Sequence, residues 1–189
     1  MCGRYNFSQE ESEEIQAIVR EIERRQGVTG LKTGEIYPTN AAPVLLAEND
    51  AITPALFSWG FPGFKGQRVI INARAETAPE KPMFRASLAA RRCVIPSTGF
   101  YEWDNHRQKY RFNLPDSTAL YMAGFYNEFK GEPRYVILTT AANNSIADVH
   151  NRMPVVLEKD MIRTWIQDEA AAREILRAEP PLLERKLVS

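Results

Sequence analysis

The sequence has few of the residues that build disulfide frameworks and zinc sites. Its cysteines are Cys2 and Cys93, and its histidines are His106 and His150. Two cysteines are too few for a disulfide framework, so we expect a reducing, cytoplasmic setting. Two histidines give a structural zinc site little support. We therefore expect neither a metal nor a cofactor.

Long apolar runs are missing as well. No run approaches the roughly 18 apolar residues that a membrane span requires. The N-terminal residues Cys-Gly-Arg-Tyr-Asn lack the basic and apolar regions of a signal peptide. We therefore expect no membrane association.

The chain also lacks net charge, but its charge is unevenly distributed. Residues 60–111 carry ten basic and four acidic side chains, a net charge of +6. Residues 8–23 carry six glutamates and one arginine, a net charge of −5. Because local field rather than net charge steers a polyanion, the basic middle remains compatible with nucleic-acid binding.

The pattern of short elements predicts one α+β domain over residues 1–189. Ser8 and Glu11 form a capping-box signature, and an apolar stripe from Ile15 to Ile22 at helical spacing predicts a helix ending at Gly27. Many short strands with a few peripheral helices predict a curled, barrel-like, mostly antiparallel β core. The predicted strands are residues 42–48, 51–59, 68–72, 93–96, 100–104, 110–114, 119–126, 134–139 and 155–157, and the other predicted helices are residues 83–90, 159–167 and 169–178.

The second residue is the most reactive feature of the chain. A small residue after the initiator methionine normally permits removal of that methionine, which would leave Cys2 with a free α-amine beside its thiol. Reference pKa values near 7.7–8.0 for the amine and 8.5 for the thiol leave both partly deprotonated at neutral pH. Such a pair can condense with an aldehyde to an imine and then a thiazolidine. The alternative is an ordinary small apolar residue at the start of a strand.

Three other segments are rich in polar reactive residues. Asn72 ends an apolar strand and could orient a nucleophile, or it could cap a turn. Glu102 lies between two aromatic residues, and burial there would raise its pKa into the range of a general acid or base, unless it lies on a half-exposed strand. His150 has a pKa suited to proton transfer, but it could equally be a packing or capping group. His106 is expected at the surface and Cys93 in the core.

These segments together resemble the SOS response-associated peptidase (SRAP) family. The family hallmarks are a Met-Cys-Gly-Arg-Tyr start, an Asn-Ala-Arg-Ala-Glu segment, a Phe-Tyr-Glu-Trp segment after a Pro-x-x-Gly turn, and a His-x-Arg-Met-Pro segment. All four occur here in this order, between Cys2 and about Leu157. Chance coincidence of four spaced motifs is remote.

The resemblance implies the SRAP fold and a sensor of abasic sites in single-stranded DNA. Such a sensor traps the ring-opened aldehyde as a thiazolidine DNA–protein crosslink. Carried over, Cys2 is the nucleophile and Asn72 holds the N-terminus and the sugar. Glu102 moves protons for imine formation and crosslink reversal and assists autoproteolytic removal of Met1, and His150 protonates the sugar-ring oxygen. We expect a monomer that acts in the cytoplasm, on the nucleoid.

The resemblance also predicts residues that contact DNA. Arginines suit phosphate because the planar guanidinium gives bidentate contacts. Aromatic rings suit bases because stacking on them tolerates any sequence. The predicted DNA-binding residues are Arg4, Trp59, Arg74, Arg85, Trp103, Arg152, Met153 and Pro154.

Two other functions stay open from the residues. Cys2 with His150 and Glu102 or Asn72 resembles the Cys-His arrangement of a cysteine peptidase acting on other proteins. The basic middle with Trp59 and Trp103 could also form a non-covalent single-stranded DNA binding module. The latter predicts reversible, salt-sensitive binding that is indifferent to Cys2.

Overall fold

The computed structural model describes residues 2–63 and 68–188. The removal predicted for Met1 and the part of the basic middle over residues 64–67, which includes Lys65, lie outside these residues. The helices are α1 (Glu13–Gln26), α2 (Pro82–Ala90), α3 (Met161–Gln167) and α4 (Glu169–Ile175). The strands are β1 (Tyr5–Phe7), β2 (Gly34–Ile36), β3 (Ala41–Glu48), β4 (Ala51–Trp59), β5 (Phe61–Pro62), β6 (Val69–Ile70), β7 (Asn72–Arg74), β8 (Arg92–Ser97), β9 (Gly99–Trp103), β10 (Lys109–Asn113), β11 (Leu120–Phe129), β12 (Glu132–Ala141), β13 (Arg152–Pro154), β14 (Val156–Leu157) and β15 (Glu184–Val188).

Five strands close into a barrel, which confirms the predicted β core. Their order is β12-β4-β3-β8-β11, and pairing of β11 with β12 closes the ring. Only the β12–β4 pair within this ring is parallel. Two tight hairpins contribute to it. The turn between β3 and β4 is formed by Asn49 and Asp50, and the turn between β11 and β12 by Lys130 and Gly131. All four residues have positive φ. Such two-residue turns match the twist of the flanking strands.

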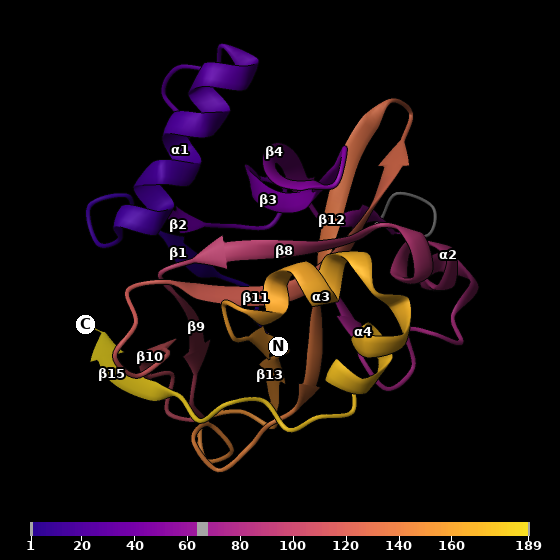
Figure 1. Cartoon of the computed structure of the whole chain (residues 1–189). Helices are drawn as coiled ribbons and strands as arrows, with labels where there is room; N and C mark the ends of the chain where they lie inside the picture. Colours follow the sequence, from indigo (N-terminus) through magenta and orange to yellow (C-terminus); the bar gives the residue numbers. More distant parts are fainter. Residues whose placement is uncertain (1, 64–67, 189) are drawn as a thin grey trace.

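A second sheet carries the N-terminal strand. Its order is β15-β10-β9-β1-β2. In Figure 1 this sheet lies below and beside the barrel, with α3 and α4 in front of β8 and β11 and with α1 standing apart on another side. No helix among the described residues is long and apolar enough to cross a membrane.

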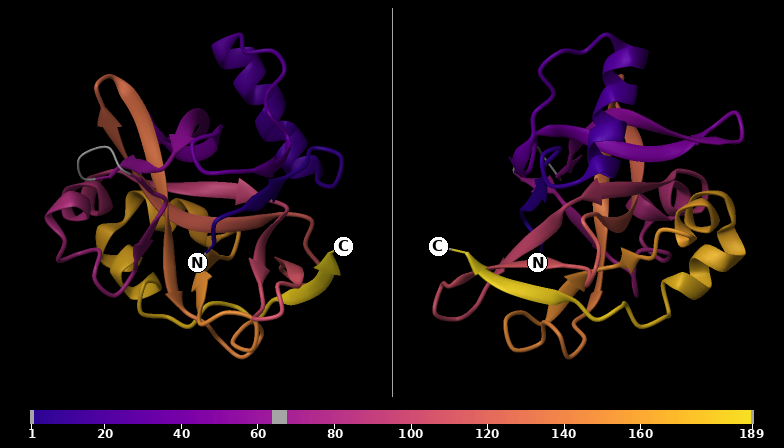
Figure 2. Two further views of the ribbon diagram at one scale, coloured as in Figure 1. Left: turned by 180° about the vertical axis from the view of Figure 1, so that it is seen from behind. Right: turned by 60° about the vertical axis from the view of Figure 1, so that its left-hand side comes forward.

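Edge strands β7 and β13 position the site. Thr139 of β12 is aligned with Arg74 of β7 on one edge and with Pro154 of β13 on the other. Because β7 is parallel and β13 antiparallel to β12, the segment after β7 and the turn before β13 reach the same end of the barrel. The N-terminal end of the chain lies next to β13 in the views of Figures 1 and 2.

Several predicted boundaries need correction. The capping box at Ser8 is wrong: α1 starts at Glu13, because Ser12 is the N-cap and its Oγ accepts from the Ile15 N–H at 3.4 Å. Glu11 instead accepts from the side-chain amide of Asn6 at 3.2 Å. The strand predicted over residues 68–72 divides into β6 and β7, which pair with different partners.

Candidate active site and nucleic-acid interface

Pairing with β9 holds the N-terminal segment in place. Tyr5 of β1 is aligned with Phe100 of β9, and the Tyr101 N–H donates to the Arg4 carbonyl at 2.9 Å. Cys2 has no exposed surface, and its Sγ lies 3.7 Å from the Arg4 carbonyl, to which it donates. The predicted nucleophile thus lies in the core, as a small apolar residue would, and alongside the strand that carries Glu102.

Cys2 and Glu102 are close enough to influence each other's charge. Glu102 is 4% exposed, and this burial raises the pKa of its carboxyl group. Burial, followed by the negative charge of Glu102, raises the pKa of the Cys2 thiol. The thiol is therefore protonated at neutral pH, and the raised pKa makes the carboxyl group a better proton acceptor than an exposed glutamate.

Asn72 presents a buried amide at the start of β7. Both its Oδ1 and its Nδ2 are buried, and neither has a hydrogen-bond partner among the residues that the structure describes. Buried polar groups in proteins are nearly always hydrogen-bonded, and an unmade bond costs about 1–3 kcal/mol. The Asn72 amide is therefore suited to hold a polar ligand.

The backbone fixes the tautomer of His150. Its Nδ1 accepts a hydrogen bond from the Arg152 N–H at 3.0 Å. Burial, as the largest cause, lowers the pKa of the imidazole. At neutral pH the ring is therefore mainly uncharged with its proton on Nε2, which makes Nε2 a hydrogen-bond donor.

These groups lie on four segments, two of which, the N-terminal segment and β9, are paired. Cys2 belongs to the same core cluster as Val149 and Met153, which flank His150 and Arg152 in the chain. Glu102, on β9, lies close enough to Cys2 for its charge to raise the pKa of the Cys2 thiol. Asn72 lies on β7, across β12 from β13.

Carboxylates already pair with two of the predicted phosphate-binding arginines. Arg152 donates to Glu76 through Nη1 at 2.6 Å and Nη2 at 2.9 Å. Arg4 donates to Glu35 at 3.2 Å. Both arginines would have to exchange or share these partners to hold a phosphate.

The other predicted cations and one ring lie at the surface. Arg74 and Arg85 are exposed, and neither forms an ion pair with another described residue. Trp103 is half-buried, and the Arg4 guanidinium carbon lies 5.1 Å from its ring centroid. Sequence reasoning missed Tyr37, whose 40% exposed ring lies 4.2 Å from the same guanidinium carbon. The signal available in the sequence was an aromatic residue directly before a proline, Pro38.

Three predicted DNA contacts are buried in the structure and need correction. Trp59 has no exposed surface, because it packs inside the barrel between Tyr5 and Tyr135. A ring without exposed surface cannot stack on a base. Met153 and Pro154 are also buried, and Met153 belongs to the core.

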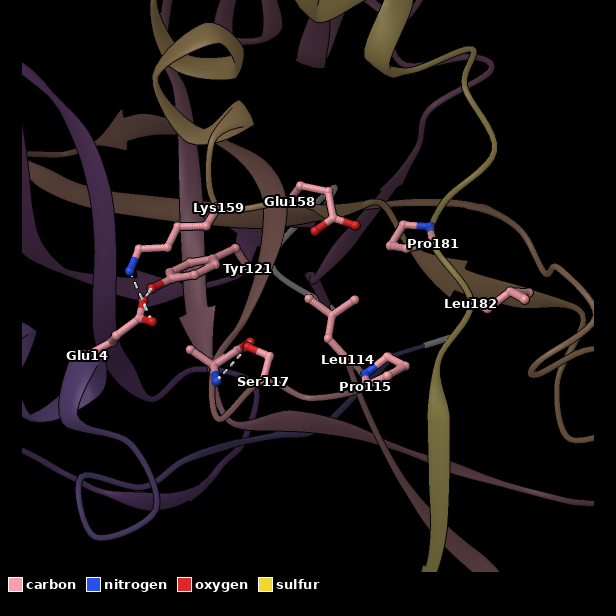
Figure 3. A pocket seen from close by; sticks show the side chains of 10 residues that line it. Glu14, Leu114, Pro115, Ser117, Tyr121, Glu158, Lys159, Pro181 and Leu182 are labelled. Carbon is pink, nitrogen blue, oxygen red and sulfur yellow. Dashed lines mark hydrogen bonds and ion pairs between the residues drawn. The ribbon is translucent and has the colours of Figure 1, made fainter.

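Two cavities lie beside this region rather than in it. The first cavity, of about 290 Å³, lies where α1 and β11 approach the segment before β15. In its wall, Lys159 and the Tyr121 hydroxyl both contact Glu14 (Figure 3). The other, of about 650 Å³, lies between α2 and α4 and includes Glu76 and Arg85 in its lining. None of the four predicted catalytic residues lines either cavity.

Known proteins resemble the chain over most of its length. The model of the SOS response associated peptidase (SRAP) family matches residues 1–187. The abasic site processing protein YoqW of Bacillus subtilis is 33% identical, over 94% of this chain and 85% of its own. The abasic site processing protein YedK of Escherichia coli is 28% identical, over 92% of this chain and 83% of its own. A solved structure from Bacteroides thetaiotaomicron shares the fold, with a TM-score of 0.78 and 22% identity over 100% of this chain and 92% of that one.

Proposed function

This chain belongs to the SOS response associated peptidase family, and from that premise we propose that it processes abasic sites in DNA. The relatives named as abasic site processing proteins support this role. The substrate that we propose is single-stranded DNA with an abasic site. Residues 1–189 would act as one monomeric SRAP-type domain in the cytoplasm, on the nucleoid.

The observation that carries the chemistry is the Cys2 thiol beside the Glu102 carboxyl group. As long as Met1 is attached, the Cys2 nitrogen is a peptide nitrogen, so hydrolysis of that bond must come first. The freed amine then adds to the aldehyde carbon and water leaves, which gives an imine. The thiol adds to the imine carbon, the sulfur loses its proton and the nitrogen gains one. One water is released and no oxidant is required.

Glu102 is suited to the proton transfers of this sequence. Its raised pKa lets the carboxyl group take the thiol proton and return a proton to nitrogen, and the reverse order would open the crosslink. Water attack on the Met1–Cys2 bond could use the same base. The neutral His150 ring would donate a hydrogen bond from Nε2 to the sugar-ring oxygen. The unpartnered Asn72 amide would hold the new N-terminus and the sugar.

Exposed cations and one aromatic surface would hold the strand. Arg74 and Arg85 are open to phosphates, and Arg152 and Arg4 would join them by exchanging their carboxylate partners. Trp103 offers a half-exposed ring for stacking, which is worth about 1–3 kcal/mol per base. Trp59, Met153 and Pro154 have no part in these contacts.

The pKa of the Cys2 thiol disfavours a peptidase acting on other proteins. Reactive cysteines of peptidases attack as thiolates and have lowered pKa values, whereas the pKa of the Cys2 thiol is raised. We therefore expect hydrolysis only of the chain's own Met1–Cys2 bond. Cleavage of added peptides would instead favour the alternative function, a cysteine peptidase that acts on other proteins.

Intact mass spectrometry tests the proposal. Purified protein should start at Cys2 and, with an abasic single-stranded oligonucleotide, gain the oligonucleotide mass minus one water in a heat-stable adduct. Cys93→Ser is the matched control, because Cys93 is the other buried cysteine, and it should react normally. Cys2→Ser should give no stable adduct. Retained Met1, an adduct that dissociates on heating, or an equally stable Cys2→Ser adduct would overturn the chemistry.

A further inference from the structure

A layer of three aromatic rings fills the barrel near the N-terminal segment. The ring centroids of Tyr5 and Trp59 are 5.3 Å apart. The rings of Trp59 and Tyr135 stack with planes 5° apart at 6.3 Å. The hydroxyls of Tyr5 and Tyr135 are 2.7 Å apart, and all three residues are fully buried.

The indole of Trp59 also binds the backbone that leads into Asn72. Its Nε1 donates to the Ile71 carbonyl at 3.0 Å, and the Ile137 N–H donates to the same oxygen at 3.1 Å. The Ile71 carbonyl and the Asn72 N–H belong to one planar peptide unit. Two donors from different strands therefore fix the orientation from which the Asn72 side chain starts.

The same indole contacts the segment that carries the nucleophile. Tyr5 follows Cys2 by three residues, and its ring packs on Trp59 on the side of the N-terminal segment. Tyr5, Trp59 and Cys2 belong to one core cluster. One side chain thus links the two elements that carry Cys2 and Asn72.

We infer that Trp59 is a positioning residue, which sets Asn72 relative to the N-terminal cysteine. This inference rests on the proposed function. Its support is the Asn72 amide, which is buried and unpartnered among the described residues although its backbone is held by two hydrogen bonds. A side chain that must lie at a fixed place in the site is sensitive to displacement, since misplacement by about 1 Å can lower the reaction rate about 10²-fold.

Trp59→Phe tests the inference, with Trp165→Phe as matched control. Both indoles are fully buried and donate to a backbone carbonyl, Trp59 to Ile71 and Trp165 to Cys93 at 2.8 Å. Both variants should unfold at lower denaturant concentration. Only Trp59→Phe should slow single-turnover adduct formation at saturating DNA, by about 10- to 100-fold. Affinity for an unreactive abasic analogue should stay within about twofold in both, because neither indole touches solvent.

A second readout requires no reaction. The side-chain NH₂ resonances of Asn72 in ¹⁵N spectra of the DNA-free protein should move or broaden in Trp59→Phe and stay in place in Trp165→Phe. If the wild-type protein forms no adduct, the proposed function fails, while the spectra still decide whether Trp59 positions Asn72. Unchanged resonances in Trp59→Phe, or equal rate losses in both variants, would overturn the inference. If Trp59→Phe does not fold, Tyr135→Phe loosens the same ring layer, and unmoved Asn72 resonances would then count against the inference.

Discussion

Replacing Glu76 by glutamine should strengthen DNA binding. The Glu76 carboxylate occupies the guanidinium fork of Arg152, with both oxygens within 2.9 Å of a donor nitrogen. The hydrogen bonds from Arg152 lower the pKa of Glu76, so the carboxylate is ionised throughout the neutral range. A phosphate that binds Arg152 must displace or share this anion. Glutamine keeps one acceptor oxygen and removes the charge.

The exposure of Glu76 bounds the size of this effect. Its side chain is 47% exposed and that of Arg152 is 15% exposed, so water screens the pair. Exposed ion pairs contribute about 0.2–1 kcal/mol, and 1 kcal/mol corresponds to about a fivefold change in affinity. One more unpaired cation should also steepen the salt dependence, by about 0.7 in log K against log salt. We therefore expect about two- to fivefold tighter binding at low salt and a smaller gain at high salt.

Fluorescence anisotropy with a tetrahydrofuran abasic analogue measures this affinity, because the analogue has no aldehyde to react. Glu80→Gln is the matched control: Glu80 lies in the same exposed segment and forms no ion pair with another described residue. Its affinity change should be smaller than that of Glu76→Gln. Weaker binding of Glu76→Gln, or a salt slope equal to that of Glu80→Gln, would refute the competition between carboxylate and phosphate.

Three further predictions concern single groups. Arg74→Ala should weaken binding and reduce the salt slope by about 0.7, and an unaltered slope would remove its phosphate contact. Tyr135→Phe leaves the buried Tyr5 hydroxyl unpaired and should lower the free energy of unfolding in urea by about 1–3 kcal/mol. The double Tyr5→Phe/Tyr135→Phe variant should have nearly the wild-type free energy of unfolding, and a loss equal to the sum of the two single variants would contradict this. Because burial raises the pKa of Glu102, its contribution to stability is complete below its unfolded pKa of about 4.3 and is lost as pH rises through the folded value. Glu102→Gln should therefore gain stability relative to the wild type as the pH rises above about 4.3, and a constant difference would be evidence against a raised pKa.

Local patterns predicted the long strands well. The strand over residues 51–59 agrees with β4, and β3 differs by one residue, because Asn49 and Asp50 mark the turn and the flanking residues are apolar. Strands β1, β2, β13 and β15 were not predicted. Each has five residues or fewer, and each depends on partners distant in sequence, as Tyr5 does on Ile36 and Phe100.

For the candidate site, the sequence likewise indicated the residue types but not the directions of their side chains. Residue types and motifs indicated Cys2, Asn72, Glu102 and His150, and their roles remain proposals. The direction of a side chain at a strand end could not be read from the sequence. Trp59 therefore entered the predictions as a base-stacking ring, whereas it faces the barrel interior.

Before DNA binds, the groups proposed for the reaction are uncharged or paired with an opposite charge. The Cys2 thiol is protonated, the His150 ring is mainly uncharged, and Arg152 is paired with Glu76. Each of these conditions lowers reactivity toward a stray aldehyde or anion. A DNA phosphate can exchange with Glu76, whereas a small free aldehyde carries no charge that could do so. Selectivity for abasic DNA would then arise from the requirement that phosphate binding and aldehyde capture occur together. A Glu76→Gln protein that gains DNA affinity without reacting faster with small aldehydes would fit this mechanism.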